Sequence, residues 1–148
     1  MRLWHKELIY VLPKQQLLSQ WRECCSIAKR IAEKGTPNHI LVNRVLEYPV
    51  DNFVQYTEKI IREFDNRGFK ISEKALENFR SNIEKGKHRF NNQRICGLFI
   101  NWHNDIYLRE CLYNLEEKYL CGGISGKEWN RICCRFGSFD LFIYNSDK

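Results

Sequence analysis

The feature that most constrains the fold is a helical repeat of apolar residues between two prolines. Over residues 14–34 the repeat consists of Leu17, Trp21, Cys24, Cys25, Ala28, Ile31 and Ala32. Apolar residues at this spacing share one face of an α-helix. Pro13 precedes the repeat and Gly35-Thr36-Pro37 follows it, as is typical of a helix start and stop. The sequence therefore predicts a helix over residues 14–34.

Similar repeats predict four more helices. Apolar residues at helical spacing run from Val50 to Phe64, and Arg67-Gly68-Phe69 closes that helix with Gly68 as a left-handed cap. Ser72 can cap a third helix, and residues 104–120 form a fourth with a continuous apolar face.

The C-terminal part completes this pattern. Ser125-Gly126-Lys127-Glu128 matches a capping box that opens a short helix, and an apolar tail follows from Phe139 to Tyr144. A chain of 148 residues can bury one real core but is too short for two comfortable domains. We therefore expect a mainly α protein, a single compact helical domain over residues 1–148. It should have four to five helices, irregular loops and an extended C-terminal tail.

Charge and cysteine content limit the classes of partner. The net charge is +6, which favours an anionic partner, most simply nucleic acid. The seven cysteines include no C-x-x-C pair, so we expect reduced thiols rather than a metal site or disulfides. No apolar run approaches the roughly 20 residues of a membrane span, and the N-terminus does not resemble a secretory signal. These features predict a cytoplasmic protein.

The unit Gln15-Gln16-Leu17-Leu18-Ser19-Gln20-Trp21-Arg22-Glu23 lies on the first predicted helix, close to the chain start. At neutral pH about a tenth of a free α-amine is the neutral nucleophile, against about 0.04% of an ordinary lysine. A carboxylate close to such an amine, as Glu23 could be, would stabilise an imine or oxocarbenium cation on an attacked sugar. Alternatively, Glu23 is an ordinary helix carboxylate that pairs with basic neighbours. From the residues alone both interpretations stay open.

The chain resembles the pyrimidine-dimer DNA glycosylases of the phage endonuclease V type at three short motifs. The first is Gln15 and Leu17 followed by Trp21-Arg22-Glu23, which is the most specific match. The second is Arg67-Gly68-Phe69 with Ile71 at a helix end. The third is Leu115-Glu116-Glu117-Lys118, followed by Trp129 and Arg131. The matches occur in the family's order along the whole chain.

The resemblance implies an enzyme without cofactor or metal that acts on double-stranded DNA with damaged bases or abasic sites. In the family, the N-terminal amine attacks the sugar C1′, an imine forms, the base leaves and β-elimination nicks the strand. Met1 would supply the amine and Glu23 the essential carboxylate. The implied DNA contacts are Arg2, Gln15, Arg22, Lys118, Trp129 and Arg131. We expect the protein to act as a monomer.

The chain departs from the family pattern at several DNA-contacting positions. The phage enzymes lose their initiator Met, whereas the large Arg2 side chain should block that removal here. Gln16, Ser26 and Asn114 replace basic residues of the family, and Arg30 could substitute only loosely for the one at Ser26. These losses bear on dimer specificity more than on glycosylase or lyase chemistry.

Other residues have two interpretations. His39 follows a turn and could contact DNA or assist proton transfer, or be a surface histidine. Trp129 could stack on a base, or belong to the core. Three hypotheses follow: a glycosylase with abasic-site lyase activity, a non-catalytic nucleic-acid-binding module of the same fold, and a helical scaffold that binds protein.

Overall fold

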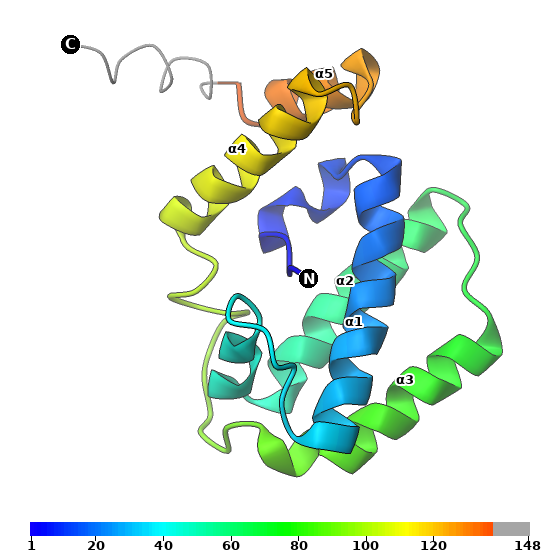
Figure 1. Cartoon of the computed structure of the whole chain (residues 1–148), viewed down its shortest axis with the longest axis vertical. Coiled ribbons are helices and arrows are strands. Elements are labelled where there is room, and N and C mark those ends of the chain that lie inside the picture. The colour runs from blue at the N-terminus through cyan, green and yellow to red at the C-terminus, as the bar shows by residue number, and fades with distance from the viewer. Residues whose placement is uncertain (138–148) are drawn as a thin grey trace.

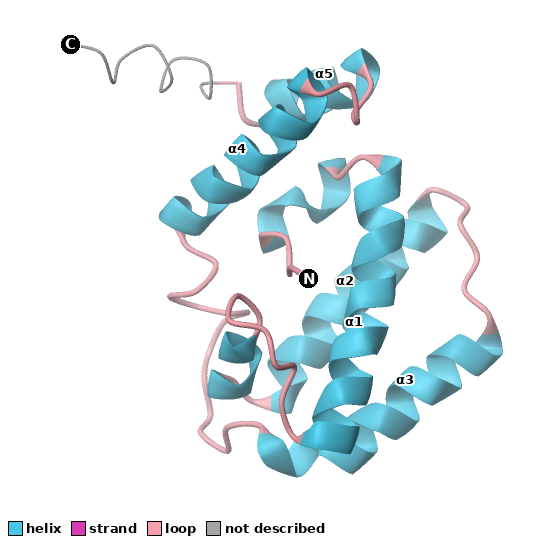
Figure 2. Ribbon diagram, in the orientation of Figure 1, coloured by secondary structure: helices cyan, strands magenta, loops and turns pink. Residues whose placement is uncertain are grey.

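The computed structural model describes residues 1–137, and this part of the chain folds into helices without strands. In chain order the elements are the 3₁₀ helix η1 (Lys6–Val11), α1 (Lys14–Lys34), the 3₁₀ helix η2 (Asn43–Glu47), α2 (Val50–Asn66), α3 (Glu73–Gly86), the 3₁₀ helix η3 (Lys87–Arg89), α4 (Asp105–Leu120) and α5 (Gly126–Arg135). Figure 2 shows helices joined only by loops. The predicted mainly α fold is confirmed, and the apolar tail from Phe139 to Tyr144 lies outside the described residues.

Helix α1 has the predicted bounds. Its C-terminal end is capped by the neighbouring Gly35, whereas its N-terminal end is capped by a residue distant in the sequence. Gly35 takes a left-handed conformation, with φ of 77°, and its amide donates to the Ile31 carbonyl at 2.8 Å. Pro13 cannot cap the first turn with a side chain. Glu128 of α5 instead accepts from the Lys14 amide at 2.9 Å, a bond that lowers the pKa of Glu128. Helix α5 therefore helps to fix where α1 begins.

Helices α1, α2 and α3 share a buried aromatic core. The Phe79 ring of α3 lies 5.7 Å from the ring of Trp21 and 5.9 Å from that of Phe53. Near its end, α3 approaches α1 so closely that a Cβ on Gly86 would lie 3.0 Å from Ile31 Cγ2. This close approach keeps the C-terminal half of α3 against α1 (Figure 1).

The Arg67-Gly68-Phe69 turn ties α2 to the start of the chain. The Arg67 guanidinium is mostly buried, pairs with Glu63 at 2.7 Å and donates to the Leu12 carbonyl at 2.7 Å. Gly68 has φ of 73°, as predicted for the left-handed cap. Arg67 thus holds the end of η1, an element that lacks a helical apolar repeat and was not predicted.

Helices α4 and α5 lie on the other side of the chain start from α1 (Figure 1). Asn104 caps α4 by accepting from the Tyr107 amide at 2.9 Å, and both bonds of the predicted Ser125–Glu128 capping box are present. All seven cysteines are free thiols, of which Cys24 and Cys111 are buried. Within residues 1–137, the helices are too short or too polar to cross a bilayer.

Candidate active site

The first residues of the chain lie between α1, α2 and α4, where side chains of all three helices hold their backbone. Gln20 of α1 is buried, donates to the Arg2 carbonyl at 2.9 Å and accepts from the Trp4 amide at 2.8 Å. Glu23, one turn further along α1, accepts from the Arg2 amide at 2.7 Å. Residues three apart on a helix share a face, so one face of α1 aligns the chain start.

Two tyrosines complete this clamp. Tyr56 of α2 donates from its hydroxyl to the Trp4 carbonyl at 2.6 Å, and Tyr107 of α4 donates to the Leu3 carbonyl. Burial raises the pKa of both Tyr56 and Tyr107, so both hydroxyls keep their protons and remain donors. The position of the chain start is therefore fixed by groups far away in the sequence.

The Glu23 carboxylate is close to the Met1 amine but does not bind it directly. Three covalent bonds separate the Met1 nitrogen from the Arg2 amide nitrogen, which limits their distance to about 3.7 Å. The Met1 nitrogen thus lies within about 6.5 Å of Glu23 Oε2. The structure has no ion pair between the Met1 amine and Glu23, and the donor that binds the carboxylate is the Arg2 amide. The amine and the carboxylate are neighbours separated by one peptide unit.

Met1 and Glu23 both line one open pocket of about 340 Å³. Its walls are Met1, Arg2, Trp4, Glu23, His39, Leu41, Asn114 and Lys118. Among these, the Met1 amine, Arg2 and Lys118 are cationic, and Glu23 is the one carboxylate. The structure thus brings five of the predicted site residues together: Met1, Arg2, Glu23, His39 and Lys118.

The Arg2 side chain forms a wall of this pocket rather than a free end. Its guanidinium carbon lies 5.2 Å from the centre of the Trp4 ring, and its Nη1 lies 4.0 Å from Cys111 Sγ. Asn114, one of the positions at which the resemblance implies a basic residue, lines the same pocket.

The other predicted DNA-contacting residues lie outside the pocket. Gln15 and Arg22 are exposed on α1, and Arg30 donates to the Pro37 carbonyl at 3.2 Å. Trp129 is half-buried and stacks on Tyr119 with ring centres 5.4 Å apart, and Arg131 donates to the Tyr10 carbonyl at 3.2 Å. Arg30, Trp129 and Arg131 therefore each make a contact within the fold. Arg22 follows Trp21 directly and precedes Glu23, next to the pocket along the helix.

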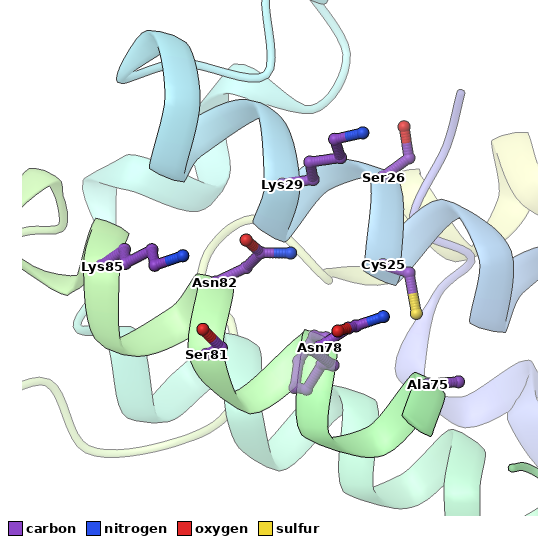
Figure 3. Close-up of a pocket in the computed structure, with 9 residues that line it drawn as sticks. Cys25, Ser26, Lys29, Ala75, Asn78, Ser81, Asn82 and Lys85 are labelled. Atoms are coloured by element: carbon purple, nitrogen blue, oxygen red, sulfur yellow. The ribbon is translucent and has the colours of Figure 1, made fainter. Parts of the chain in front are cut away.

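A second, larger hollow of about 530 Å³ lies between α1 and α3 (Figure 3). Lys29 and Lys85 are its charged residues, with Ser26, Asn78, Ser81 and Asn82 as polar neighbours. No carboxylate lines it, and Ser26 lies one helical turn after Glu23 on α1. This hollow is thus a cationic, hydrogen-bonding surface between α1 and α3 that shares no lining residue with the pocket of Met1 and Glu23.

Sequence reasoning missed the residues that hold the chain start. Gln20 had a usable signal, because it precedes Glu23 by three residues on the same helix face. Tyr56 and Tyr107 had none, since their partners lie 52 and 104 residues away along the chain. Leu41, which lines the pocket beside His39, was also missed.

Comparison with known proteins gives one match. The family model described as pyrimidine dimer DNA glycosylase matches residues 1–77, which include α1, α2 and the Arg67-Gly68-Phe69 turn. No curated protein and no solved structure matches the chain. The matched range contains Met1, Arg2, Glu23 and His39 of the pocket, whereas Asn114 and Lys118 lie beyond it.

Proposed function

Because the chain belongs to the pyrimidine dimer DNA glycosylase family, we propose that it removes a damaged base from double-stranded DNA and nicks the strand there. The observation that supports this most is the shared pocket of Met1 and Glu23, in which the carboxylate binds the peptide amide next to the amine. A free amine at Met1 would be the nucleophile. The pyrimidine dimer named by the family is the first lesion to test.

The chemistry follows from these two groups. The neutral amine attacks the sugar C1′, the bond between C1′ and the base breaks, and the base leaves with the bonding electrons and takes up a proton. The amine nitrogen then loses one proton, the C1′–O4′ bond of the sugar ring breaks as O4′ takes up a proton, and the nitrogen, which keeps its second proton, is joined to C1′ as a cationic imine. Loss of a proton from C2′ then expels the 3′ phosphate by β-elimination. Glu23 would stabilise the cation formed at C1′.

The arrangement of Glu23 supports this role in a second way. A carboxylate paired directly with an amine favours its charged, non-nucleophilic form. Here the nearest donor to Glu23 is the Arg2 amide, so the carboxylate lies near the reaction without an ion pair to Met1. The negative charge is thus available for the sugar cation once it forms.

Cationic groups around the pocket would bind the DNA backbone. Lys118 lines the pocket, and Arg22 is exposed on α1 one residue before Glu23, with a guanidinium that can hold a phosphate through paired donors. The hollow between α1 and α3 offers Lys29 and Lys85 to further phosphates of the DNA (Figure 3). Phosphate contacts of this kind position DNA without reading its sequence.

Borohydride trapping tests the proposal. The untagged chain, beginning at Met1, is mixed with duplex DNA that contains an abasic site, and borohydride reduces any imine to a stable adduct. We expect an adduct from the native chain, at least a hundredfold less from Glu23→Gln, and none when a tag extends the N-terminus. Glu58→Gln, an exposed position on α2, is the matched control and should trap normally.

The other hypotheses give different results. A nucleic-acid-binding module would bind DNA with strong salt dependence, unchanged in Glu23→Gln, and would form no adduct. A protein-binding scaffold would show neither salt-dependent DNA binding nor an adduct. Absence of an adduct from the untagged native chain would overturn the proposed chemistry. Release of base from dimer-containing DNA, measured beside abasic-site cleavage, tells whether the lesion is the dimer.

A further inference from the structure

Two aliphatic side chains stand in solvent at the edge of the candidate active site. They are Ile40, with 86% of its surface exposed, and Leu41, with 51%. Both lie in the turn between α1 and η2. Adjacent aliphatic residues at this exposure have no role in the core, while the next residue, Val42, is fully buried and anchors the turn.

The turn holds these side chains in place through its own hydrogen bonds. Asn43 Oδ1 accepts from the His39 amide at 3.0 Å, and Thr36 Oγ1 accepts from the Asn38 amide at 3.1 Å. Arg30 of α1 donates to the Pro37 carbonyl at 3.2 Å. Backbone bonds from the amides of Val42 and Asn43 to the His39 carbonyl, both at 2.9 Å, close the turn. The exposure of Ile40 is therefore a built feature of the turn.

Leu41 lies where two hollows meet. It lines the pocket that contains Met1 and Glu23, next to His39. Together with Ile40 it also lines a neighbouring hollow of about 240 Å³, whose walls include Trp102 and Ile106. Ile106 is itself 67% exposed. An apolar edge thus separates the reactive pocket from a second, partly aromatic recess.

We propose that Ile40 and Leu41 form a wedge that enters the base stack beside the damaged nucleotide. This inference rests on the proposed function. An attack on C1′ within a duplex requires that the base stack is opened at the lesion. Many proteins that kink duplex DNA open the stack by inserting apolar side chains such as Ile and Leu between base steps. The rigid turn beside the pocket meets this requirement.

The wedge is tested on duplex and single-stranded DNA with the same abasic site. The variant carries Ile40→Ala together with Leu41→Ala, and the control is Leu120→Ala, an equally apolar position that is 76% exposed at the end of α4. We expect the trapping rate of the double variant to fall at least tenfold on the duplex and less than twofold on the single strand. Leu120→Ala should match the native chain on both.

A fluorescent base reports the insertion itself. With 2-aminopurine opposite the abasic site, the native chain should raise the fluorescence on binding because that base loses its stacking. The double variant should raise it far less at saturating protein. Ile40→Leu, which keeps an aliphatic side chain, should retain both the native trapping rate on the duplex and the native rise in fluorescence.

The outcomes separate the wedge from the proposed chemistry. If the native chain traps neither DNA, the proposed function fails. If the native chain traps both and the double variant retains the native duplex rate, the wedge is wrong. That second result would leave Ile40 and Leu41 as a surface for a protein partner. Unchanged melting temperature of the double variant excludes misfolding as the cause of a slower duplex rate.

Discussion

The Arg2 amide donates a hydrogen bond of 2.7 Å to Glu23 Oε2, which joins the chain start to the middle of α1. Because the amide belongs to the peptide that follows Met1, this one bond limits the distance between the carboxylate and the terminal amine. Effective chemistry between two groups requires that their geometry is fixed in advance. The clamp formed by Gln20, Tyr56 and Tyr107 holds the backbone that follows the amine, and the helix holds Glu23.

The first prediction concerns Gln20. In Gln20→Ala, the Trp4 amide and the Arg2 carbonyl lose their side-chain partner in a buried setting, which should lower the free energy of unfolding by about 1–3 kcal/mol. Trapping of abasic DNA should fall more than this loss of stability explains, because the amine is no longer held near Glu23. Urea unfolding and trapping at a temperature well below the melting point measure the two effects.

Gln55→Ala is the matched control for this change. Gln55 is exposed on α2, so its replacement should shift the unfolding free energy by less than about 0.5 kcal/mol and leave trapping intact. A Gln20→Ala chain that is destabilised yet traps at the native rate would mean that the clamp only stabilises the fold.

The second prediction concerns the hollow between α1 and α3. If Lys29 and Lys85 contact two phosphates, replacing both with Ala should reduce the slope of log affinity against log salt by about 1.8 for duplex DNA. The affinity should weaken for all sequences alike, since phosphate contacts do not read bases. Fluorescence anisotropy titrations at several salt concentrations measure the slope. An unchanged slope would place the DNA elsewhere.

Lys59 and Lys127 offer a control of equal charge. Neither lines the pocket or the hollow, so Lys59→Ala with Lys127→Ala removes the same two charges from other parts of the surface. We expect this variant to keep the native slope. If this control lost as much slope as the variant that replaces Lys29 and Lys85, the effect would come from net charge in general and not from phosphate contacts in the hollow.

The bounds of the helices were predictable because their signals are local. Pro13, Gly35, Gly68 and Ser72 each act through the backbone of their own turn, and each lies at the predicted helix boundary in the structure. The 3₁₀ helix η1 was not predicted, because its six residues give no apolar repeat. Its capping residue is His5, and histidine is a residue type that also occurs in turns and cores, so it does not signal a helix start.

The site was predictable only in part, because its geometry depends on distant residues. The resemblance indicated Met1 and Glu23, and the structure places both in one pocket. The hydrogen-bond partner of Glu23, however, is the Arg2 amide. The position of this amide depends on Tyr56 and Tyr107, which bind the backbone carbonyls of the following residues. Contacts across 52 and 104 residues leave no pattern in a single sequence.

The third prediction concerns pH and the buried histidine pair. His5 and His103 are stacked with ring centres 5.2 Å apart, and burial lowers the pKa of His103 to about 2 and also lowers that of His5. The unfolded chain binds a proton at His103 below pH about 6.5, whereas the folded protein does not. The stabilisation is thus complete above this pH and is lost as the pH falls. His103 alone should cost about 2 kcal/mol between pH 7 and pH 5.

Urea unfolding across this pH range, with two variants, isolates the contribution. Between pH 7 and pH 5, the unfolding free energy of His103→Phe should fall by about 2 kcal/mol less than that of the native chain. The variant should nevertheless be less stable at pH 7, because the Lys6 amide loses its acceptor. His39→Ala, which removes a half-buried histidine outside the pair, should keep the native dependence. Parallel curves for the native chain and His103→Phe would contradict the assignment.

The fourth prediction compares two glycines within helices. In Gly86→Ala the new Cβ meets Ile31 Cγ2 at 3.0 Å and the Ala32 amide nitrogen at 3.2 Å, so the packing of α3 against α1 must shift locally to accept it. We expect a loss of about 1–3 kcal/mol in unfolding free energy. Gly126→Ala, at the first residue of α5, meets nothing within 4 Å and should gain up to about 1 kcal/mol from helix propensity. Urea unfolding measures both. Equal stabilisation by the two variants would mean that α1 and α3 pack less closely than the structure has them.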